Sequence, residues 1–218
     1  IKLSGTIGIG HVRWATHGKP STINAHPHSS DNVSVVHNGI IENSTILKKI
    51  LEKKGYKFKS QTDTEVIVHL VTDYLKKNNL KDAIIKVLKK LHGSFALGII
   101  FKDQPDLIIG ARRGSPLAVG YGPDEHYLGS DSYALKSMTN KISYLNDGEF
   151  CILKKDQVEF FDSDGIKTNK EVLNLSKDEQ NYEKGQYKYF MAKEIDEQPV
   201  TIKNCINETD QLVKISLC

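Results

Sequence analysis

The chain has 218 residues, which is enough for one large domain with a hydrophobic core. Its 30 Lys and Arg nearly balance its 27 Asp and Glu, and the basic residues are scattered rather than aligned with aromatics, so we expect no nucleic-acid partner. No apolar run approaches the roughly 20 residues of a membrane-spanning helix, and no signal-peptide pattern opens the chain, so we expect a soluble cytoplasmic protein with no membrane partner.

Two short strands are predicted near the start of the chain. Residues 5–12 alternate small and β-branched side chains, and residues 33–37 form a second run of this kind. Three amphipathic helices follow, because apolar residues recur there on one helical face. These helices are predicted over residues 44–54, 66–75 and 80–91. Gly55 suits the left-handed position just after the first helix, and the third ends near Gly93.

The next part of the chain is predicted to be a largely antiparallel set of strands with few helices. Its short apolar or alternating runs are bounded by Gly, Pro and Asp, and Asp-Gly pairs at 147–148 and 164–165 mark turns. The runs cover residues 94–101, 107–111, 117–121, 149–153 and 158–161. Helices beside antiparallel strands, without alternating βαβ units, predict an α+β architecture.

A change of composition marks the predicted domain boundary. Residues 167–186 are polar and charged without a period, which is typical of an exposed connection. From residue 187 a new element begins, which we expect to be a helix leading towards another domain. We therefore assign residues 1–186 to one domain and residues 187–218 to a linker or the start of the next. Because the chain begins with Ile1 rather than Met, we also expect a preceding segment in the intact protein.

Asn38-Gly39 is a candidate pair of donors for an oxyanion. An Asn amide beside a backbone N–H on a Gly turn can present two donors to one oxygen. Taken alone, Asn-Gly is most often a hairpin turn. Here the pair follows a predicted strand directly and precedes residues 40–43 and a helix rather than a returning strand, so we do not expect the simplest hairpin to close.

Arg13 and Asp63 are candidates for binding the two charged groups of an amino acid. The Arg13 guanidinium, at the end of the first predicted strand, could hold an α-carboxylate bidentately, although a surface salt bridge is the ordinary alternative. Thr62 and Glu65 have the spacing of a capping box for the second helix, which would by itself explain this segment. Asp63 adds a carboxylate at the same helix start, where it could accept hydrogen bonds from a substrate ammonium.

The loop after Arg13 is a candidate lid. Trp14 is the only tryptophan, and it stands beside Thr16 and His17 in a polar segment bounded by Gly and Pro. Such a segment is too polar for a core strand and suits a loop that closes over a ligand.

The eight histidines raise the question of a metal site. His26 and His28 are two residues apart, and His11, His17 and His37 are near them in the sequence. No further Asp, Glu, Cys or His at metal-site spacing completes a coordination shell. We therefore expect no metal, and histidines that support the structure or other residues.

Four segments, in this order, resemble signature segments of the glucosamine-6-phosphate synthase family, also called glutamine-fructose-6-phosphate aminotransferases. They are residues 13–18, 25–28, 36–43 and 62–65, and further similarity extends through residues 114–117, 130–131, 193–194 and 197–199. The resemblance covers nearly the whole chain. It implies an N-terminal-nucleophile (Ntn) hydrolase fold, an αββα four-layer sandwich with two antiparallel sheets between helical layers, here truncated at its N-terminus.

The resemblance also implies roles for the candidate residues and for a ligand, L-glutamine. Asn38 and Gly39 would form the oxyanion hole, Arg13 and Asp63 would bind the glutamine head group, and the loop with Trp14, Thr16 and His17 would close over it. No metal or organic cofactor is implied. The family nucleophile is an N-terminal Cys, which this chain does not contain.

The three cysteines of the chain fall in other segments. Cys151, Cys205 and Cys218 lie far apart and form no CxxC pair, so we expect reduced thiols rather than a zinc site or disulfides. A fragment of a larger enzyme, inactive by itself, is therefore the expected interpretation.

The parent enzyme would pass ammonia from glutamine to fructose-6-phosphate in a missing isomerase domain, and we expect it to be a homodimer. Two alternatives remain open: a catalytically silent glutamine-binding regulatory module, and an amidotransferase domain that serves another acceptor. The retained Asn38-Gly39 pair argues against the first, because a pure binding module has no use for an oxyanion hole.

Overall fold

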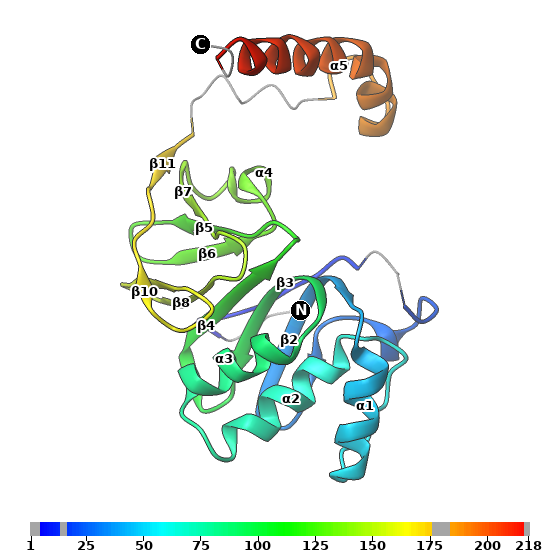
Figure 1. Ribbon diagram of the computed structural model, residues 1–218, viewed down its shortest axis with the longest axis vertical. Helices are drawn as coiled ribbons and strands as arrows, with labels where there is room; N and C mark the ends of the chain where they lie inside the picture. Colours follow the sequence, from blue (N-terminus) through cyan, green and yellow to red (C-terminus); the bar gives the residue numbers. More distant parts are fainter. Residues whose placement is uncertain (1–4, 14–16, 176–183, 216–218) are drawn as a thin grey trace. The chain divides into compact units, whose positions relative to one another are not determined.

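The computed structural model describes residues 5–13, 17–175 and 184–215 (Figure 1). The chain divides between Leu175 and Ser176 into two compact units. The described sheets all belong to the first unit, and the second unit contains one long helix.

Two antiparallel sheets form the centre of the first unit. In the described part of the chain, the larger sheet has the strand order β1-β2-β3-β4-β8-β9-β10 and the smaller one β11-β7-β5-β6. The strands of the larger sheet are β1 (His28–Ser29), β2 (Val33–Ile41), β3 (Gly93–Phe101), β4 (Gln104–Arg113), β8 (Phe150–Lys154), β9 (Val158–Phe161) and β10 (Lys167–Thr168). Those of the smaller sheet are β5 (Ala118–Tyr121), β6 (His126–Gly129), β7 (Lys141–Tyr144) and β11 (Leu173–Asn174).

Three helices pack on one side of the larger sheet (Figure 1). They are α1 (Ser44–Lys53), α2 (Glu65–Leu75) and α3 (Leu80–Lys90), close to their predicted ranges. Gly55 has a φ of +91° just after α1, as predicted for a helix end. The Asn79 side chain caps α3 by accepting a hydrogen bond from the Asp82 N–H. Two shorter helical turns are η1 (Thr22–Asn24) and α4 (Ser132–Leu135).

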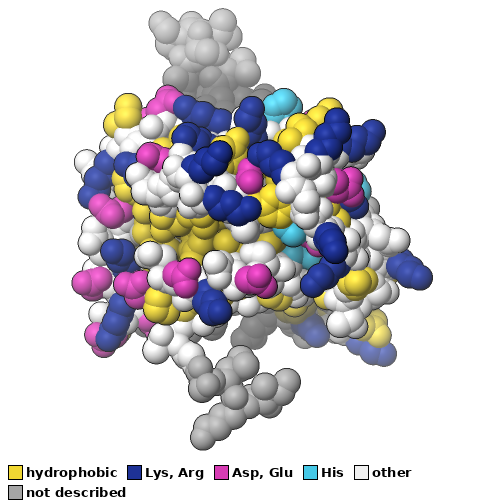
Figure 2. Space-filling model, turned by 90° about the horizontal axis from the view of Figure 1, so that it is seen from below, with side chains coloured by type: hydrophobic (Ala, Val, Ile, Leu, Met, Phe, Trp, Pro, Cys, Tyr) yellow, Lys and Arg dark blue, Asp and Glu magenta, His cyan; other side chains and the backbone are white. Residues whose placement is uncertain are grey.

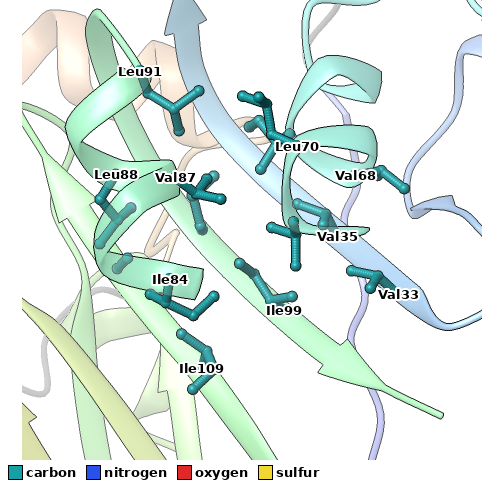
Figure 3. Packing of buried hydrophobic residues seen from close by; sticks show 14 of the residues in the cluster. Val33, Val35, Val68, Leu70, Ile84, Val87, Leu88, Leu91, Ile99 and Ile109 are labelled. Atoms are coloured by element: carbon teal, nitrogen blue, oxygen red, sulfur yellow. The ribbon is translucent and has the colours of Figure 1, made fainter. Parts of the chain in front are cut away.

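The main core lies between these helices and the larger sheet. Because side chains alternate along a strand, every second residue of β2, β3 and β4 points to the helices. Figure 3 shows this packing, with Val33, Val35, Ile99 and Ile109 from the strands facing Leu70, Ile84, Val87 and Leu88 from the helices. Ile99 is fully buried.

The opposite face of the larger sheet packs on the smaller sheet. Ala96, Cys151 and Leu153 from the larger sheet are in one buried cluster with Leu117 and Val119. The order of layers is therefore helices, larger sheet, smaller sheet. The predicted α+β architecture with antiparallel strands is confirmed.

The structure corrects the predicted strand over residues 5–12. This segment has no regular strand, since it pairs with no other strand among the described residues, and Val12 is fully exposed. The alternation of small and branched residues was therefore not sufficient for a strand. Conversely, the predicted strand 33–37 continues to Ile41 as β2.

Several short strands were not predicted. β1, β10 and β11 have two residues each, too few for an alternating pattern, and β6 and β7 have four residues each without a run of apolar side chains. The predicted runs at 94–101, 107–111, 117–121, 149–153 and 158–161 correspond to β3, β4, β5, β8 and β9.

The second unit covers Ser176–Cys218, and its described element is α5 (Phe190–Ile215). The helix predicted after residue 187 is thus present, with Pro199 inside it. The assignment of residues 1–186 and 187–218 to two domains stays a prediction. None of the helices in the described ranges combines the length and the hydropathy that a membrane crossing requires.

Charged side chains are spread over the surface. On the face seen in Figure 2, Lys and Arg side chains are dispersed among acidic and uncharged ones, with a hydrophobic area between them. Some oppositely charged side chains form ion pairs at the surface, such as Lys89 with Asp164 and Lys167 with Glu159. Exposed pairs of this kind contribute little stability, typically about 0–1 kcal/mol.

Candidate functional site

A pocket of about 330 Å³ lies at one edge of β2. The two residues of β1 pair with Ser34 and Val35 only, so among the described residues no strand pairs with this edge of residues 36–41. Polar residues from the described segments 11–13, 17–26 and 60–64 lie there instead. The pocket is lined by His11, Arg13, His17, His26, His37, Asn38, Gly39, Ile40, Thr62, Asp63, Thr64 and Ser94.

The backbone of β2 presents N–H groups to this pocket. The His37 N–H donates to His26 Nδ1 at 3.3 Å, and the Ile41 N–H donates to Asp63 Oδ2 at 2.7 Å. N–H groups of a strand alternate in direction, so the Gly39 N–H is expected on the same edge, midway between these two anchored groups.

The structure corrects the position predicted for Asn38-Gly39. These residues do not follow a strand but lie inside β2, opposite Ala96 and Phe95 of β3, so they form no hairpin turn. Gly39 has a φ of +125°, and a Cβ added there would lie 2.2 Å from the Ser94 carbonyl oxygen. Only glycine fits this backbone, which permits close packing of the strand against β3 beside the pocket.

The Arg13 side chain is bound to the backbone of residues 17–19. Arg13 has a φ of +48°, and its guanidinium Nη2 donates to the carbonyl oxygens of His17 and Gly18 at 2.9 and 3.0 Å, while Nη1 donates to the carbonyl oxygen of Lys19 at 3.3 Å. Both bidentate modes of a guanidinium use Nη2. A bidentate grip on a carboxylate would therefore compete with these carbonyl oxygens, and the loop would have to shift.

Asp63 is buried and held in place by the Ile41 N–H. Its second oxygen, Oδ1, lies 3.9 Å from His17 Nδ1. One carboxylate oxygen is thus fixed by the sheet edge, and the other faces the loop of Arg13 and His17. This arrangement brings the two residues predicted to recognise an amino acid head group to the same pocket.

The predicted capping box at 62–65 is not formed. Glu65 reaches further back and accepts hydrogen bonds from the N–H groups of Lys59 and Ser60 and from the Ser60 hydroxyl, at 2.7–2.8 Å. Thr62 instead contacts His28 Nε2 at 2.9 Å. Burial alone would raise the pKa of Glu65, but these hydrogen bonds outweigh it and lower the pKa. The Glu65 carboxylate therefore fixes the segment that carries Asp63.

Histidines form one wall of the pocket. The rings of His11 and His26 stack with centroids 4.4 Å apart, and His26 meets His28 edge-on at 5.1 Å. Burial, followed by the neighbouring His11 ring, lowers the pKa of His26 to about 3, and burial also lowers the pKa of His28 and His37. These rings are therefore neutral near pH 7. The described residues include no group of three or more His, Cys, Asp or Glu placed to hold a metal ion.

The structure brings together five of the seven predicted site residues, namely Arg13, His17, Asn38, Gly39 and Asp63. The other two, Trp14 and Thr16, lie outside the described residues. Sequence reasoning did not assign a role to His11, which contacts Asn38 Oδ1 through Nε2 at 2.6 Å. The sequence signal that could have found it is its place two residues before Arg13.

The cysteines are elsewhere. Cys151 is buried between the two sheets, and burial raises the pKa of its thiol, whereas Cys205 is exposed on α5. Cys218 lies outside the described residues. Within the first unit, Cys151 does not line the pocket, so it is not a nucleophile for it.

A larger cavity, of about 470 Å³, lies between α1, α2 and the end of α3. Its walls are mainly apolar, and its Lys54 and Asp73 side chains pair with each other at 2.5 Å. It lacks the converging polar side chains and backbone N–H groups of the pocket at β2, which is the better candidate for chemistry.

A family model described as "Glutamine amidotransferase domain" matches residues 13–137, more than half of the chain. The chain belongs to this family. The match includes Arg13, Asn38, Gly39 and Asp63, and of the residues that line the described pocket it leaves out His11 alone.

Curated relatives of this amidotransferase domain are named glutamine–fructose-6-phosphate aminotransferase [isomerizing]. The chain is 52% identical over 206 residues to the protein of Mesorhizobium japonicum and 50% identical over 204 residues to that of Clostridium acetobutylicum. These matches cover 94% and 93% of the chain but only 34% and 33% of the relatives. The chain thus spans about one third of the length of these relatives.

The solved structure of glutamine phosphoribosylpyrophosphate amidotransferase from B. subtilis is also similar. It has a TM-score of 0.57 and 30% sequence identity, over 70% of this chain and 34% of that protein. The amidotransferase domain therefore has the Ntn hydrolase fold predicted from its sequence. Of the two helical layers expected, the described residues supply α1–α3 on the larger sheet, with the short α4 beside the smaller one.

Proposed function

We propose that this chain is the glutamine-hydrolysing domain of a protein that makes glucosamine-6-phosphate from fructose-6-phosphate and L-glutamine. The main support is the convergence of Asn38, Gly39, Arg13 and Asp63 on one pocket. Relatives named for this reaction are 50% and 52% identical to the chain, whereas the phosphoribosylpyrophosphate amidotransferase is 30% identical. The higher identity to the first group favours fructose-6-phosphate, rather than phosphoribosylpyrophosphate, as the acceptor of the ammonia.

Asn38 and Gly39 are the proposed oxyanion donors. Attack on the side-chain amide of glutamine places a negative charge on the former carbonyl oxygen. The Asn38 side-chain NH₂ and the Gly39 N–H, on neighbouring residues of β2, are suited to donate to that oxygen together. One such donor typically stabilises the transition state by about 3 kcal/mol.

Asp63 and Arg13 are the proposed head-group residues. Asp63 Oδ1 can accept from the substrate ammonium, because Oδ2 is occupied by the Ile41 N–H. Arg13 can pair with the α-carboxylate once its loop releases Nη2 from the carbonyl oxygens of His17 and Gly18. Trp14, Thr16 and His17, in the same loop, would then close over the bound glutamine.

The proposed nucleophile is an N-terminal Cys thiol outside these 218 residues, with its own α-amine as the base. The thiolate would displace ammonia from the amide, and water would then hydrolyse the thioester to glutamate. We expect the 218-residue chain alone to be inactive. The ammonia would pass to fructose-6-phosphate in a following isomerase domain of a cytoplasmic homodimer.

The test uses the full-length protein that contains this domain. With glutamine and fructose-6-phosphate, we expect equal amounts of glutamate and glucosamine-6-phosphate. Asn38→Ala should lower kcat for glutamate formation by about 100- to 1,000-fold. Ile166→Ala, at a side chain that is 66% exposed, should leave kcat unchanged and is the control. Absence of glutamate would refute the glutaminase assignment, and glutamate without glucosamine-6-phosphate would point to another acceptor.

A further inference from the structure

His11 connects two residues of the pocket that are far apart in the sequence. Its Nε2 lies 2.6 Å from Asn38 Oδ1, and its Nδ1 accepts a hydrogen bond from the Arg13 N–H at 2.8 Å. Each ring nitrogen therefore has one partner. One partner is a proposed oxyanion donor, and the other is the backbone of a proposed head-group residue.

The two contacts determine which atoms carry hydrogens. A backbone N–H can only donate, so Nδ1 of His11 accepts from Arg13 and the proton of the neutral imidazole is on Nε2. Nε2 must then donate to Asn38, and the Asn38 atom that faces it must be the amide oxygen. The contact itself thus settles the orientation of the Asn38 amide, with the NH₂ group turned away from His11.

We propose that His11 is a positioning residue, which holds the Asn38 amide in the orientation that leaves its NH₂ group free for the oxyanion. Without His11 the amide can rotate and present its oxygen, which repels a negative charge. The inference rests on the proposed function of Asn38. The His11 ring is itself held, because it stacks on His26, whose Nδ1 accepts from the His37 N–H.

Two substitutions separate the two contacts of His11. The side-chain oxygen of Asn can take the place of Nδ1, so His11→Asn keeps the acceptor for the Arg13 N–H and loses the donor to Asn38. The side-chain nitrogen of Gln can take the place of Nε2, so His11→Gln keeps the donor to Asn38 and loses the acceptor for Arg13. Both variants therefore carry a polar amide side chain, but each one keeps the contact that the other loses.

In the full-length protein, His11→Asn should lower kcat for glutamine hydrolysis by about 10- to 100-fold, because misplacing a catalytic group by about 1 Å has costs of this size. KM for glutamine should stay within about 2-fold of the wild-type value. His11→Gln should recover most of kcat. His92→Asn, at an exposed histidine outside the pocket, is the control and should match the wild type. Equal loss of kcat in both His11 variants would overturn the proposal.

A double-substitution cycle tests whether His11 acts through Asn38. In an Asn38→Ala background, His11→Asn should change kcat by less than about 3-fold, because its target is already gone. The same loss in both backgrounds would contradict the proposal, since His11 would then act independently of Asn38.

A measurement on the 218-residue chain separates this proposal from the proposed function. The NMR signals of the Asn38 side-chain NH₂ should shift towards those of a free amide in His11→Asn and stay near their wild-type positions in His11→Gln. Unchanged signals in His11→Asn would overturn the positioning role. An inactive wild-type enzyme would instead refute the glutaminase function, with the NMR result still deciding the role of His11.

Discussion

One side of β2 belongs to the hydrophobic core, and one edge of the same strand belongs to the candidate functional site. On the helix side, Val33 and Val35 pack among many apolar neighbours, and no single contact decides their place. At the pocket edge, polar groups depend on particular partner atoms, such as Asp63 on the Ile41 N–H or Asn38 on His11. Apolar contacts are interchangeable and hydrogen bonds between particular atoms are not. Stability and chemistry should therefore respond to different substitutions.

The largest effect is expected in the core. Ile99→Ala removes a fully buried side chain between β3 and the helices, which should lower the free energy of unfolding by about 2–5 kcal/mol. Chemical denaturation of the 218-residue chain measures this. Ile166→Ala, at an exposed side chain, should change it by less than about 0.5 kcal/mol. Similar values for the two variants would remove the contrast between core and surface.

Asp63 should show the reverse behaviour. Asp63→Asn keeps an oxygen for the Ile41 N–H but loses the charge, so glutamine binding should weaken by at least about 10-fold with a stability change below about 1 kcal/mol. Asp63→Ala leaves that N–H without an acceptor and should also lower the free energy of unfolding by about 1–3 kcal/mol. Calorimetric titration with glutamine and denaturation measure the two quantities. If Asn and Ala destabilise equally, the contact with Ile41 is not what holds the strand edge.

A pH dependence of the free energy of unfolding is also expected, and it comes from the histidine wall. The pKa of His26 is about 3 in the folded protein, against roughly 6.5 in an unfolded chain. Below pH 6.5 the unfolded state therefore binds more protons than the folded state. The free energy of unfolding should fall as the pH falls from 6.5 towards 3. Above pH 6.5 it should not depend on the protonation of His26. The lowered pKa values of His28 and His37 act in the same direction.

Denaturation curves between pH 7 and pH 5 check this, in a range where Glu65 is ionised in both states. His26→Asn keeps an oxygen near the position of Nδ1 for the His37 N–H but does not titrate, so the pH dependence should become shallower. A slope that is unchanged in this variant would mean that other groups cause it.

The core was predictable from the sequence because a periodic pattern carries it. The helices and the longer strands follow from apolar residues recurring at helical or alternating spacing, as in α3 and β3. The site was predictable only as a set of motifs. Asn38 and Asp63 were identified as candidates, but the bond from Ile41 to Asp63 joins residues 22 positions apart, and no local pattern encodes it.

The two corrections near the site have the same physical origin. The capping box at 62–65 failed because Glu65 finds three better donors upstream, at Lys59 and Ser60. The strand at 5–12 failed because a strand needs a neighbour as well as alternation, and the described chain provides none there. In both cases local spacing was correct, and tertiary partners decided the outcome.

The alternation along β2 also limits how this domain can change during evolution. His37 faces Thr64 at the start of α2, while the next residue, Asn38, contacts His11. Deleting or inserting a single residue within Val33–Ile41 would exchange the two faces beyond that point and send the Asn38 side chain towards the helices. Lineages of this domain should therefore vary in β2 by replacement alone, and length differences should accumulate in the polar stretch after residue 167.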